Sequence, residues 1–327
     1  MMQSKTEELD QLIRSAYKNT AGMVVEKNGR VLYEKYFNGY TAENAAHVFS
    51  VTKSVFSALI GIAIGQGRIQ SVRQKVMDFF PDYRLPAGET TAQTITIEHL
   101  LTMTAPYKYD TEPYEQFFSS PHPIPDALGL LGGDKPAGVF NYSAIGGTHI
   151  LSGILAAATG RSALDYANEY LFSPLDVVVP RSIALHSAEE HFAVMNDKCT
   201  SGWVADPQGF NTASWGLFLR PQDMAKFGRL YQKHGVWNGS QIVPADWVKK
   251  STAVHSRFGN LSYGYLWWVI DPNEPSYAAL GDGGNVIYVN ERTKLVVAVA
   301  SLFMPDAKDR IALIRERIEP MFENAAE

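Results

Sequence analysis

A serine and a lysine three residues apart are the first side chains in this sequence that could do chemistry together. The segment SVTK places Ser50 and Lys53 at positions i and i+3, which share one face of a helix. A serine hydroxyl becomes an effective nucleophile only when a neighbouring group removes its proton. A lysine can do this once desolvation lowers its pKa from about 10.4. The apolar run VFSALIGIAIG that follows predicts a buried helix, at whose head Lys53 would be desolvated.

Taken alone, the same four residues are also compatible with a structural role. Ser50 could cap the N-terminus of a helix, and Lys53 could bury its stem while its ammonium reaches water. A second S-x-x-K segment, Ser15 to Lys18, lies on an amphipathic stretch near the N-terminus. We interpret that second pair as exposed side chains beside an apolar stripe.

The segments around SVTK resemble a known superfamily of serine enzymes. HVFSVTKSVFSALIGIAIGQGRIQSVRQKVMDFFPDY and the following ITIEHLLTMTA resemble the opening of the serine β-lactamase and penicillin-binding-protein superfamily. Further matches follow in the expected order: VFNYSAIGGTHILSGILAAATG, YLFSPL, LRPQDMAKFGRLYQKHGVWNG, YGYLWW and GDGGNVIYVNERTKLVVAVAS. The resemblance is strongest to the branch of class C β-lactamases, S-x-x-K carboxylesterases, D-amino-acid peptidases and 6-aminohexanoate-dimer hydrolases.

The resemblance implies a third catalytic side chain. Tyr142, in the tripeptide YSA, matches the tyrosine of the superfamily's second motif, where a phenol near the nucleophile could pass a proton to the leaving group. An ordinary buried tyrosine near a helix start is the alternative. The superfamily usually has asparagine two residues later, and this chain has Ala144. The amide contact to the substrate or to Lys53 must therefore be absent or come from elsewhere.

The superfamily's third motif, Lys-Thr-Gly or His-x-Gly on a strand, aligns with Asp282-Gly283-Gly284. The resemblance implies that a substrate lies along this strand edge, and that the backbone N–H groups of Ser50 and Asn285 form the oxyanion hole. Relatives that bind anionic substrates have a cation where this chain has Asp282. We therefore expect neutral esters, or acyl groups that carry an amine, to be preferred over β-lactams.

Other chemical motifs are missing from the sequence. GDGG lacks the G-x-G-x-x-G spacing of a dinucleotide loop, and neither a G-x-S-x-G elbow nor an H-E-x-x-H zinc motif occurs. We interpret His186 and His191 as part of a solvated loop, and we expect no metal and no cofactor. Trp267 and Trp268 alternate on a predicted strand, so that one should face the core and the other the core or a pocket.

The elements that must position these residues form an α+β pattern. Strand-like segments lie at residues 22–37, with a hairpin at Asn28-Gly29, and at residues 261–303. Helical patterns cover residues 50–65, 97–103, 143–159, 162–171 and 221–232, and further helices precede the first strand and follow the last. We predict an antiparallel sheet flanked by the N- and C-terminal helices. Residues 1–47 and 238–327 would form this subdomain, residues 48–237 an inserted, mainly helical one, and the site would lie in the cleft between them.

Composition excludes several classes of partner. The formal net charge of −5 argues against nucleic acid, and no apolar run reaches the length of a membrane span. The polar N-terminal segment does not resemble a secretory signal, and the single Cys199 leaves no internal disulfide, so we expect a cytoplasmic protein. The oligomeric state is not indicated.

The function that these residues predict is a serine hydrolase that cleaves an ester or a small amide through an acyl-enzyme on Ser50. The partner would be a small-molecule acyl substrate. Three alternatives stay open: a penicillin-binding or sensor-like protein that acylates but turns over slowly, a true β-lactamase or D-amino-acid peptidase, and a catalytically silent scaffold.

Overall fold

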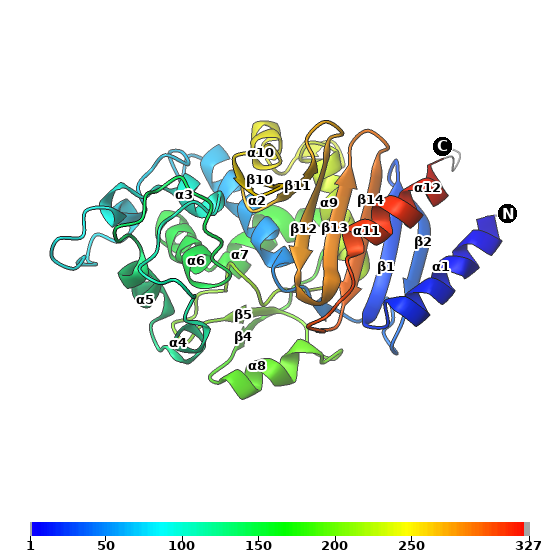
Figure 1. Cartoon of the computed structure of the whole chain (residues 1–327), viewed down its shortest axis with the longest axis horizontal. Helices are drawn as coiled ribbons and strands as arrows, with labels where there is room; N and C mark the ends of the chain where they lie inside the picture. Colours follow the sequence, from blue (N-terminus) through cyan, green and yellow to red (C-terminus); the bar gives the residue numbers. More distant parts are fainter. Residues whose placement is uncertain (1, 324–327) are drawn as a thin grey trace.

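An antiparallel sheet built from both ends of the chain organises the molecule (Figure 1). The structure, a computed structural model, describes residues 2–323. The eight strands have the spatial order β2-β1-β14-β13-β12-β11-β10-β9. Their bounds are β1 Thr20–Lys27, β2 Arg30–Tyr36, β9 Ser256–Phe258, β10 Leu261–Tyr263, β11 Trp268–Asp271, β12 Ser276–Gly281, β13 Asn285–Asn290 and β14 Leu295–Ser301. The predicted α+β class is confirmed.

The central strands are apolar on both faces because helices cover both. In β13, Val286 and Tyr288 pack on one side of the sheet, whereas Ile287 and Val289 pack on the other. The first hairpin forms where Asn-Gly predicts it, since Asn28 and Gly29 both have positive φ, of 54° and 81°. Two positive φ values are what a type I′ hairpin turn requires.

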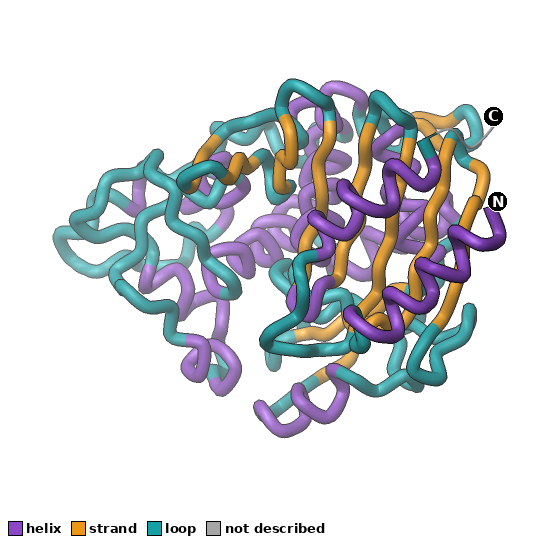
Figure 2. The backbone as a smooth tube through the Cα atoms, turned by 45° about the vertical axis from the view of Figure 1, so that its right-hand side comes forward, coloured by secondary structure: helices purple, strands orange, loops and turns teal. Residues whose placement is uncertain are grey.

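The helices lie in two layers and in a separate group (Figure 2). Helix α1 and the C-terminal helices cover one face of the sheet, and α2 and α9 lie against the other. The α-helices are α1 Met2–Ala16, α2 Val51–Gly65, α3 Ile97–Leu101, α4 Tyr114–Ser119, α5 Pro123–Leu130, α6 Gly146–Thr159, α7 Ala163–Ala167, α8 Ala188–Met195, α9 Pro221–Gln232, α10 Ala245–Ser251, α11 Arg310–Leu313 and α12 Glu319–Phe322. Two π-helical turns, Asn168–Phe172 and Ile314–Ile318, continue α7 and join α11 to α12.

Short strands and single helical turns complete the fold. Three small sheets pair β3 (Ala46–His47) with β6 (Phe218–Leu219), β4 (Ser182–Ala184) with β5 (Trp203–Ala205), and β7 (Val236–Trp237) with β8 (Ser240–Gln241). The 3₁₀ turns are Val76–Phe79, Ala92–Thr94, Ser173–Leu175 and Asp282–Gly284. The division into two subdomains, with boundaries after residues 47 and 237, stays a prediction.

Helix α2 passes through the centre of the molecule. All its residues from Val51 to Ala63 are buried, including Lys53. Gly61 allows α10 to pack closely, because a Cβ at this position would lie 2.3 Å from Trp247 Cγ. Within residues 2–323, no helix combines the length and apolar character of a membrane span.

Helix α9 packs on the sheet through a glycine, and this contact can be tested by mutation. A Cβ at Gly228 would lie 2.6 Å from Val296 Cγ1. We expect Gly228→Ala to lower the free energy of unfolding by about 1–3 kcal/mol, because the sheet must shift to admit the methyl group. The measurement is chemical denaturation of both proteins. Gly129→Ala in α5 is the control, since its Cβ would meet only the Tyr83 hydroxyl at 3.1 Å, and equal losses in both variants would contradict the prediction.

Candidate functional site

Ser50 stands at a sharp turn between β3 and the first turn of α2. Phe49, just before it, has a φ of 48°, in the left-handed region that residues with a side chain rarely adopt. Hydrogen bonds hold this turn: the Phe49 N–H donates to His47 Nδ1 at 3.3 Å, and the Thr52 hydroxyl donates to Phe49 O at 2.7 Å. Ser50 itself adopts helical angles and presents its hydroxyl to a cleft. Such a constrained turn fixes where the hydroxyl points.

Lys53 contacts Ser50, as the spacing predicts. Its Nζ lies 3.0 Å from Ser50 Oγ, 2.7 Å from Ala144 O and 3.0 Å from Ser214 O. Carbonyl oxygens only accept hydrogen bonds, so a neutral amine would use its two N–H groups on the carbonyls and direct its lone pair at the Ser50 hydroxyl. The side chain is 2% exposed, and burial lowers the pKa of Lys53 to about 7 against the opposing effect of Glu112 and Asp282. Ala144 therefore supplies, through its backbone, a contact that the missing asparagine cannot make.

Tyr142 lies at the rim of the same cleft. Its ring is 37% exposed and its centroid is 5.6 Å from Lys53 Nζ. Burial raises the pKa of Tyr142, and the Ser50 hydroxyl partly offsets the rise. The phenol therefore keeps its proton at neutral pH and can donate it. Trp268 stacks on this ring at 6.0 Å while Trp267 is fully buried, in agreement with the predicted alternation.

A buried glutamate that the sequence did not single out shapes the loop after Tyr142. Glu112 accepts hydrogen bonds from the N–H groups of Ala144, Ile145 and Gly146 at 2.6–3.0 Å, and from the Ser143 hydroxyl at 2.8 Å. The carboxylate binds these N–H groups at the start of α6, where the helix dipole favours negative charge. For this reason α6 begins at Gly146 and not at residue 143 as predicted. No motif marks Glu112, and only folding brings it to this loop.

The strand end nearest Ser50 lies one residue before the aligned triplet Asp282-Gly283-Gly284. Strand β12 pairs with β11 only as far as Ala278, so its last residues have an unpaired edge on that side. A Cβ at Gly281 would lie 2.3 Å from Val48 O and 3.1 Å from Ser50 N, so Gly281 is the residue that the Ser50 backbone approaches. Gly283 and Gly284 lie in the turn that follows β12, and their role at a substrate edge stays a prediction. Their Cβ positions face Leu302 O at 2.4 Å and Arg310 Cγ at 3.0 Å, because the chain turns back after Gly281.

The turn after β12 is held by side-chain donors on all three of its carbonyl oxygens. Asn285 Nδ2 donates to Asp282 O at 2.7 Å, Asn19 Nδ2 to Gly283 O at 2.6 Å, and the Ser301 hydroxyl to Gly284 O at 3.3 Å. The Arg310 guanidinium packs against Gly284 and donates to Asn19 Oδ1 at 2.7 Å. The buried Asn285 side chain therefore fixes the turn, whereas a role of its backbone N–H in an oxyanion hole stays a prediction.

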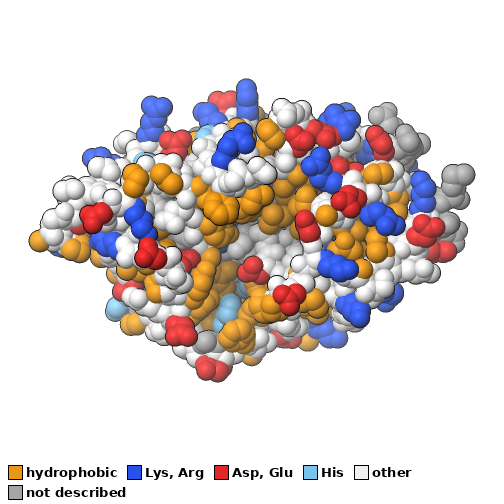
Figure 3. Space-filling view, in the orientation of Figure 1, with side chains coloured by type: hydrophobic (Ala, Val, Ile, Leu, Met, Phe, Trp, Pro, Cys, Tyr) orange, Lys and Arg blue, Asp and Glu red, His pale blue; other side chains and the backbone are white. Residues whose placement is uncertain are grey.

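The cleft in front of Ser50 has a volume of about 410 Å³. Its lining residues are His47, Phe49, Ser50, Tyr114, Phe118, Tyr142, Ala144, Ile145, His191, Phe192, Met195, Trp215, Asp282 and Phe303. Figure 3 shows this hollow near the middle of the molecule, bordered mainly by hydrophobic side chains. Among these described residues, Asp282 is the one carboxylate, and none is a lysine or arginine. No lysine or arginine of the cleft lining neutralises Asp282, although Lys53, behind Ser50, is close enough for Asp282 to raise its pKa.

The prediction that His191 lies in a solvated loop is wrong. His191 lies on α8, is 9% exposed and lines the cleft, because the apolar face of this short helix packs on the ring of His47 and on Trp215. The segment SAEEH looked polar in sequence, yet its acidic residues occupy the exposed first turn of α8. Within residues 2–323, no group of three or more His, Cys, Asp or Glu side chains could hold a metal ion.

The second S-x-x-K segment is placed as the sequence predicts. Ser15 is exposed on α1, and its hydroxyl donates to Gln11 O at 2.8 Å. That bond stays within the helix. Ser15 therefore has no contact with a buried lysine such as the one that Ser50 makes with Lys53.

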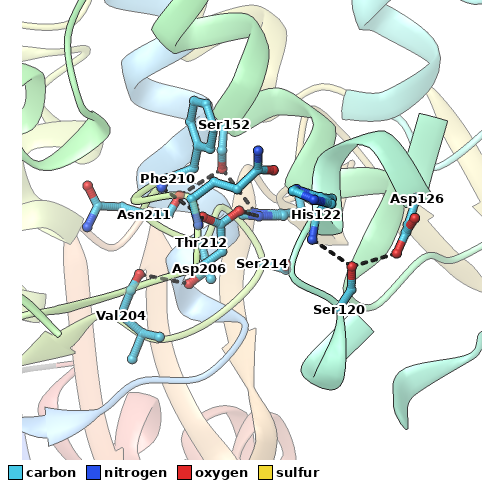
Figure 4. Close-up of polar contacts among 12 residues, drawn as sticks. Ser120, His122, Asp126, Ser152, Val204, Asp206, Phe210, Asn211, Thr212 and Ser214 are labelled. Carbon is cyan, nitrogen blue, oxygen red and sulfur yellow. Dashed lines mark hydrogen bonds and ion pairs between the residues drawn. The ribbon is translucent and has the colours of Figure 1, made fainter. Parts of the chain in front are cut away.

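A buried Ser-His-Asp group elsewhere resembles a catalytic triad only in composition. His149 Nε2 lies 2.9 Å from Asp206 Oδ2, and its Nδ1 is 3.3 Å from Ser152 Oγ. Ser152 is 2% exposed and donates its proton to Asn211 O at 2.8 Å, a contact drawn in Figure 4. A serine that donates its proton to a carbonyl, away from any opening, cannot attack a substrate.

Comparison with known proteins agrees with this geometry. A family model described as Beta-lactamase matches residues 9–319. The 6-aminohexanoate-dimer hydrolase of Paenarthrobacter ureafaciens is 23% identical over 314 residues, covering 89% of this chain and 74% of that protein. The octameric penicillin-binding protein homologue from Pyrococcus abyssi superimposes with a TM-score of 0.71 at 21% identity, covering 98% of this chain and 77% of that one. A family VIII carboxylesterase gives 0.71 at 13% identity, with coverages of 96% and 97%. The resemblance predicted from the sequence is confirmed.

The pKa of Lys53 makes a prediction about pH. If the neutral amine accepts the Ser50 proton, acylation of Ser50 by a neutral activated ester should increase with pH and level off above about pH 7. Glu112→Gln removes a negative charge that raises the pKa of Lys53, so the midpoint should move to lower pH. The measurement is the pH profile of stopped-flow acylation. Glu115→Gln, an exposed neighbour on α4, is the control and should leave the midpoint in place, and a midpoint that Glu112→Gln moves upward would contradict the assignment.

Proposed function

Because the chain belongs to the β-lactamase family, we propose that it is a serine hydrolase that cleaves an ester or small amide bond through an acyl-enzyme on Ser50. The observation that carries this proposal is the contact of Lys53 Nζ with Ser50 Oγ at 3.0 Å, with two carbonyl oxygens occupying the other positions around the nitrogen. That arrangement supports Lys53 as the base. The similar proteins include a carboxylesterase and a 6-aminohexanoate-dimer hydrolase, and their names are compatible with cleavage of an ester or of an amide bond.

In the acylation step, neutral Lys53 accepts the Ser50 proton while Oγ attacks the carbonyl carbon of the substrate. The oxygen of that carbonyl becomes negative and needs fixed N–H donors. The Ser50 N–H is one donor. For the second donor the resemblance implies the Asn285 N–H; we propose the Gly281–Asp282 segment in its place, because this segment lies on the unpaired edge of β12 beside Ser50 N.

Collapse of the intermediate breaks the bond to the leaving group. Tyr142 donates its proton to the departing oxygen or nitrogen and regains one from the ammonium of Lys53, so that no net charge stays in the site. Hydrolysis of the acyl-enzyme reverses these roles: Lys53 accepts a proton from the attacking water, and Ser50 leaves with a proton. A slow second step would make the protein a penicillin-binding or sensor-like acceptor.

Substitution at the three proposed catalytic positions tests the mechanism. Ser50→Ala should abolish turnover and covalent labelling, and Lys53→Ala should slow acylation by about 10²–10⁴-fold, since base assistance has that magnitude. Tyr142→Phe should cost less than either. The measurements are burst kinetics with a p-nitrophenyl ester and labelling by an activated serine probe. Ser15→Ala is the control for the second S-x-x-K segment and should change neither.

The outcomes separate the candidate functions. Steady turnover after the burst supports a hydrolase, whereas a stoichiometric burst that stalls supports a slowly deacylating acceptor. Failure of the probe to label the unmodified protein would indicate a silent scaffold. Near-normal rates for Lys53→Ala at neutral pH would mean that another group is the base.

The negative charge of Asp282 affects which substrates the cleft would accept. It is exposed in the cleft, at the end of the strand edge where a substrate would lie. Two like charges about 4 Å apart repel by roughly 1 kcal/mol in water and by several in a partly buried cleft. A carboxylate on the substrate would meet this repulsion with no lysine or arginine among the described lining residues to offset it.

We therefore expect neutral short-chain esters to be hydrolysed faster than penicillins or cephalosporins. Asp282→Lys should shift the preference toward the anionic substrates, because it reverses the charge at the strand end. The measurement is kcat/KM for one neutral ester and one cephalosporin in both proteins, with Asp282→Asn as the control that removes charge without reversing it. A cephalosporin rate in the unmodified protein that matches its best ester would contradict the substrate argument and leave the serine mechanism intact.

A further inference from the structure

One wall of the cleft beside Ser50 is built from aromatic rings in mutual contact. His191 packs on Trp215 at 4.3 Å and on Phe118 at 5.1 Å, and His47 packs on Phe49 at 4.2 Å, measured between ring centroids. The rings of His47 and His191 are 5.9 Å apart and join the two groups. These five residues, all in the cleft lining, are called the α8-side wall below.

This wall extends into the interior. A second, smaller pocket of about 40 Å³ shares Phe118, Ile145, His191 and Trp215 with the cleft and is also lined by Val204 and Pro123. The cleft itself, with a volume of about 410 Å³, has room beside this wall for a group larger than a methyl. A flat apolar group inserted there would exclude water and contact ring faces and edges.

The position of Tyr142 indicates which part of a substrate lies against this wall. Tyr142 belongs to a different aromatic group, with Phe140, Tyr263 and Trp268 as its ring neighbours. Tyr263 and Trp268 come from β10 and β11, which Figure 1 shows on the opposite side of the molecule from α8. Because Tyr142 donates to the leaving group, the leaving group lies toward β10 and β11. The acyl group, on the other side of the scissile bond, lies toward α8.

The wall contains two imidazole rings but carries no positive charge. Burial lowers the pKa of His47 to about 3 and that of His191 to about 4, so both imidazoles are neutral near pH 7. His47 is 1% exposed and its Nδ1 accepts the Phe49 N–H, which leaves the proton on Nε2, and that nitrogen has no hydrogen-bond partner. His191 Nδ1 also lacks one. A buried polar group that has no hydrogen-bond partner in the protein can bind a water molecule or a ligand atom.

From these contacts we infer that the acyl group of the substrate is an uncharged aromatic one, with its ring against Trp215, Phe118 and His191. This inference rests on the proposed acylation of Ser50 and names the substrate class of that site. An acyl group bearing a carboxylate is excluded, because the wall offers it no cation and Asp282 lies in the same cleft. An aliphatic ring of equal size loses the edge and face contacts that the aromatic rings provide.

Four p-nitrophenyl esters with a common leaving group test this inference: acetate, phenylacetate, cyclohexylacetate and 4-carboxyphenylacetate. Each kcat/KM is divided by the rate of alkaline hydrolysis of the same ester, which removes differences in intrinsic reactivity. We expect phenylacetate to exceed acetate by about tenfold or more, the scale on which apolar pockets discriminate. Cyclohexylacetate should fall between them, and the carboxylated ester should not exceed acetate.

Substitutions then locate the preference. Trp215→Leu and Phe118→Leu should each lower the phenylacetate-to-acetate ratio by about fivefold, because the phenyl ring loses contacts that the methyl group of acetate does not make. Phe258→Leu is the matched control: Phe258 is 63% exposed, lies on β9 and contacts Phe140, so the ratio should not change.

The possible failures are distinct. A ratio near one in the unmodified protein, or a ratio that neither wall substitution lowers, would overturn the aromatic acyl pocket while Ser50-dependent turnover still stands. If the carboxylated ester is hydrolysed faster than the acetate, the argument that the cleft disfavours a negative acyl group is overturned. Hydrolysis that survives Ser50→Ala would instead overturn the proposed function itself.

Discussion

The desolvation of Lys53 is the constraint on which the other features of the site depend. A lysine exposed to water would stay protonated at neutral pH, whereas burial lowers the pKa of Lys53 to about 7. The two carbonyl oxygens of Ala144 and Ser214 then fix the direction of the remaining lone pair toward Ser50. The buried helix α2 provides the desolvation, and two loops distant in sequence provide the carbonyls. The environment that the proposed base requires is therefore a product of the whole core and not of the S-x-x-K motif alone.

Each of those loops is in turn held by groups outside the site. Glu112 binds the N–H groups at the start of α6 and so fixes the carbonyl of Ala144 that Lys53 contacts. On the other side of Ser50, Asn19 and Arg310 hold the turn after β12 from behind, which keeps Gly281 against the serine backbone. Asn19 lies just before β1 and Arg310 begins α11, so both termini of the chain contribute to one wall of the cleft.

Charge is distributed unevenly around the cleft. The negative side chains of Glu112 and Asp282 both raise the pKa of Lys53, and burial outweighs them. The two imidazoles of the α8-side wall are neutral because burial disfavours their charged forms. The cleft lining thus has a carboxylate without a lysine or arginine at one end and aromatic rings along one side, while the family fold by itself is compatible with many acyl substrates.

The sequence by itself determined the α+β class, the terminal strands and the pair Ser50 and Lys53, because these depend on local periodicity and on a fixed i, i+3 spacing. It also determined the outcome for Ser15, whose polar surroundings give no desolvation. Only the tertiary structure decided that Gly281, and not Gly283 or Gly284, faces Ser50, since strand register and the position of a turn depend on pairing between distant segments. The sequence also did not predict the positions of Glu112, His47 and His191 in the site. A lone acidic or imidazole side chain carries no periodic signal, and its role arises from the partners that folding places around it.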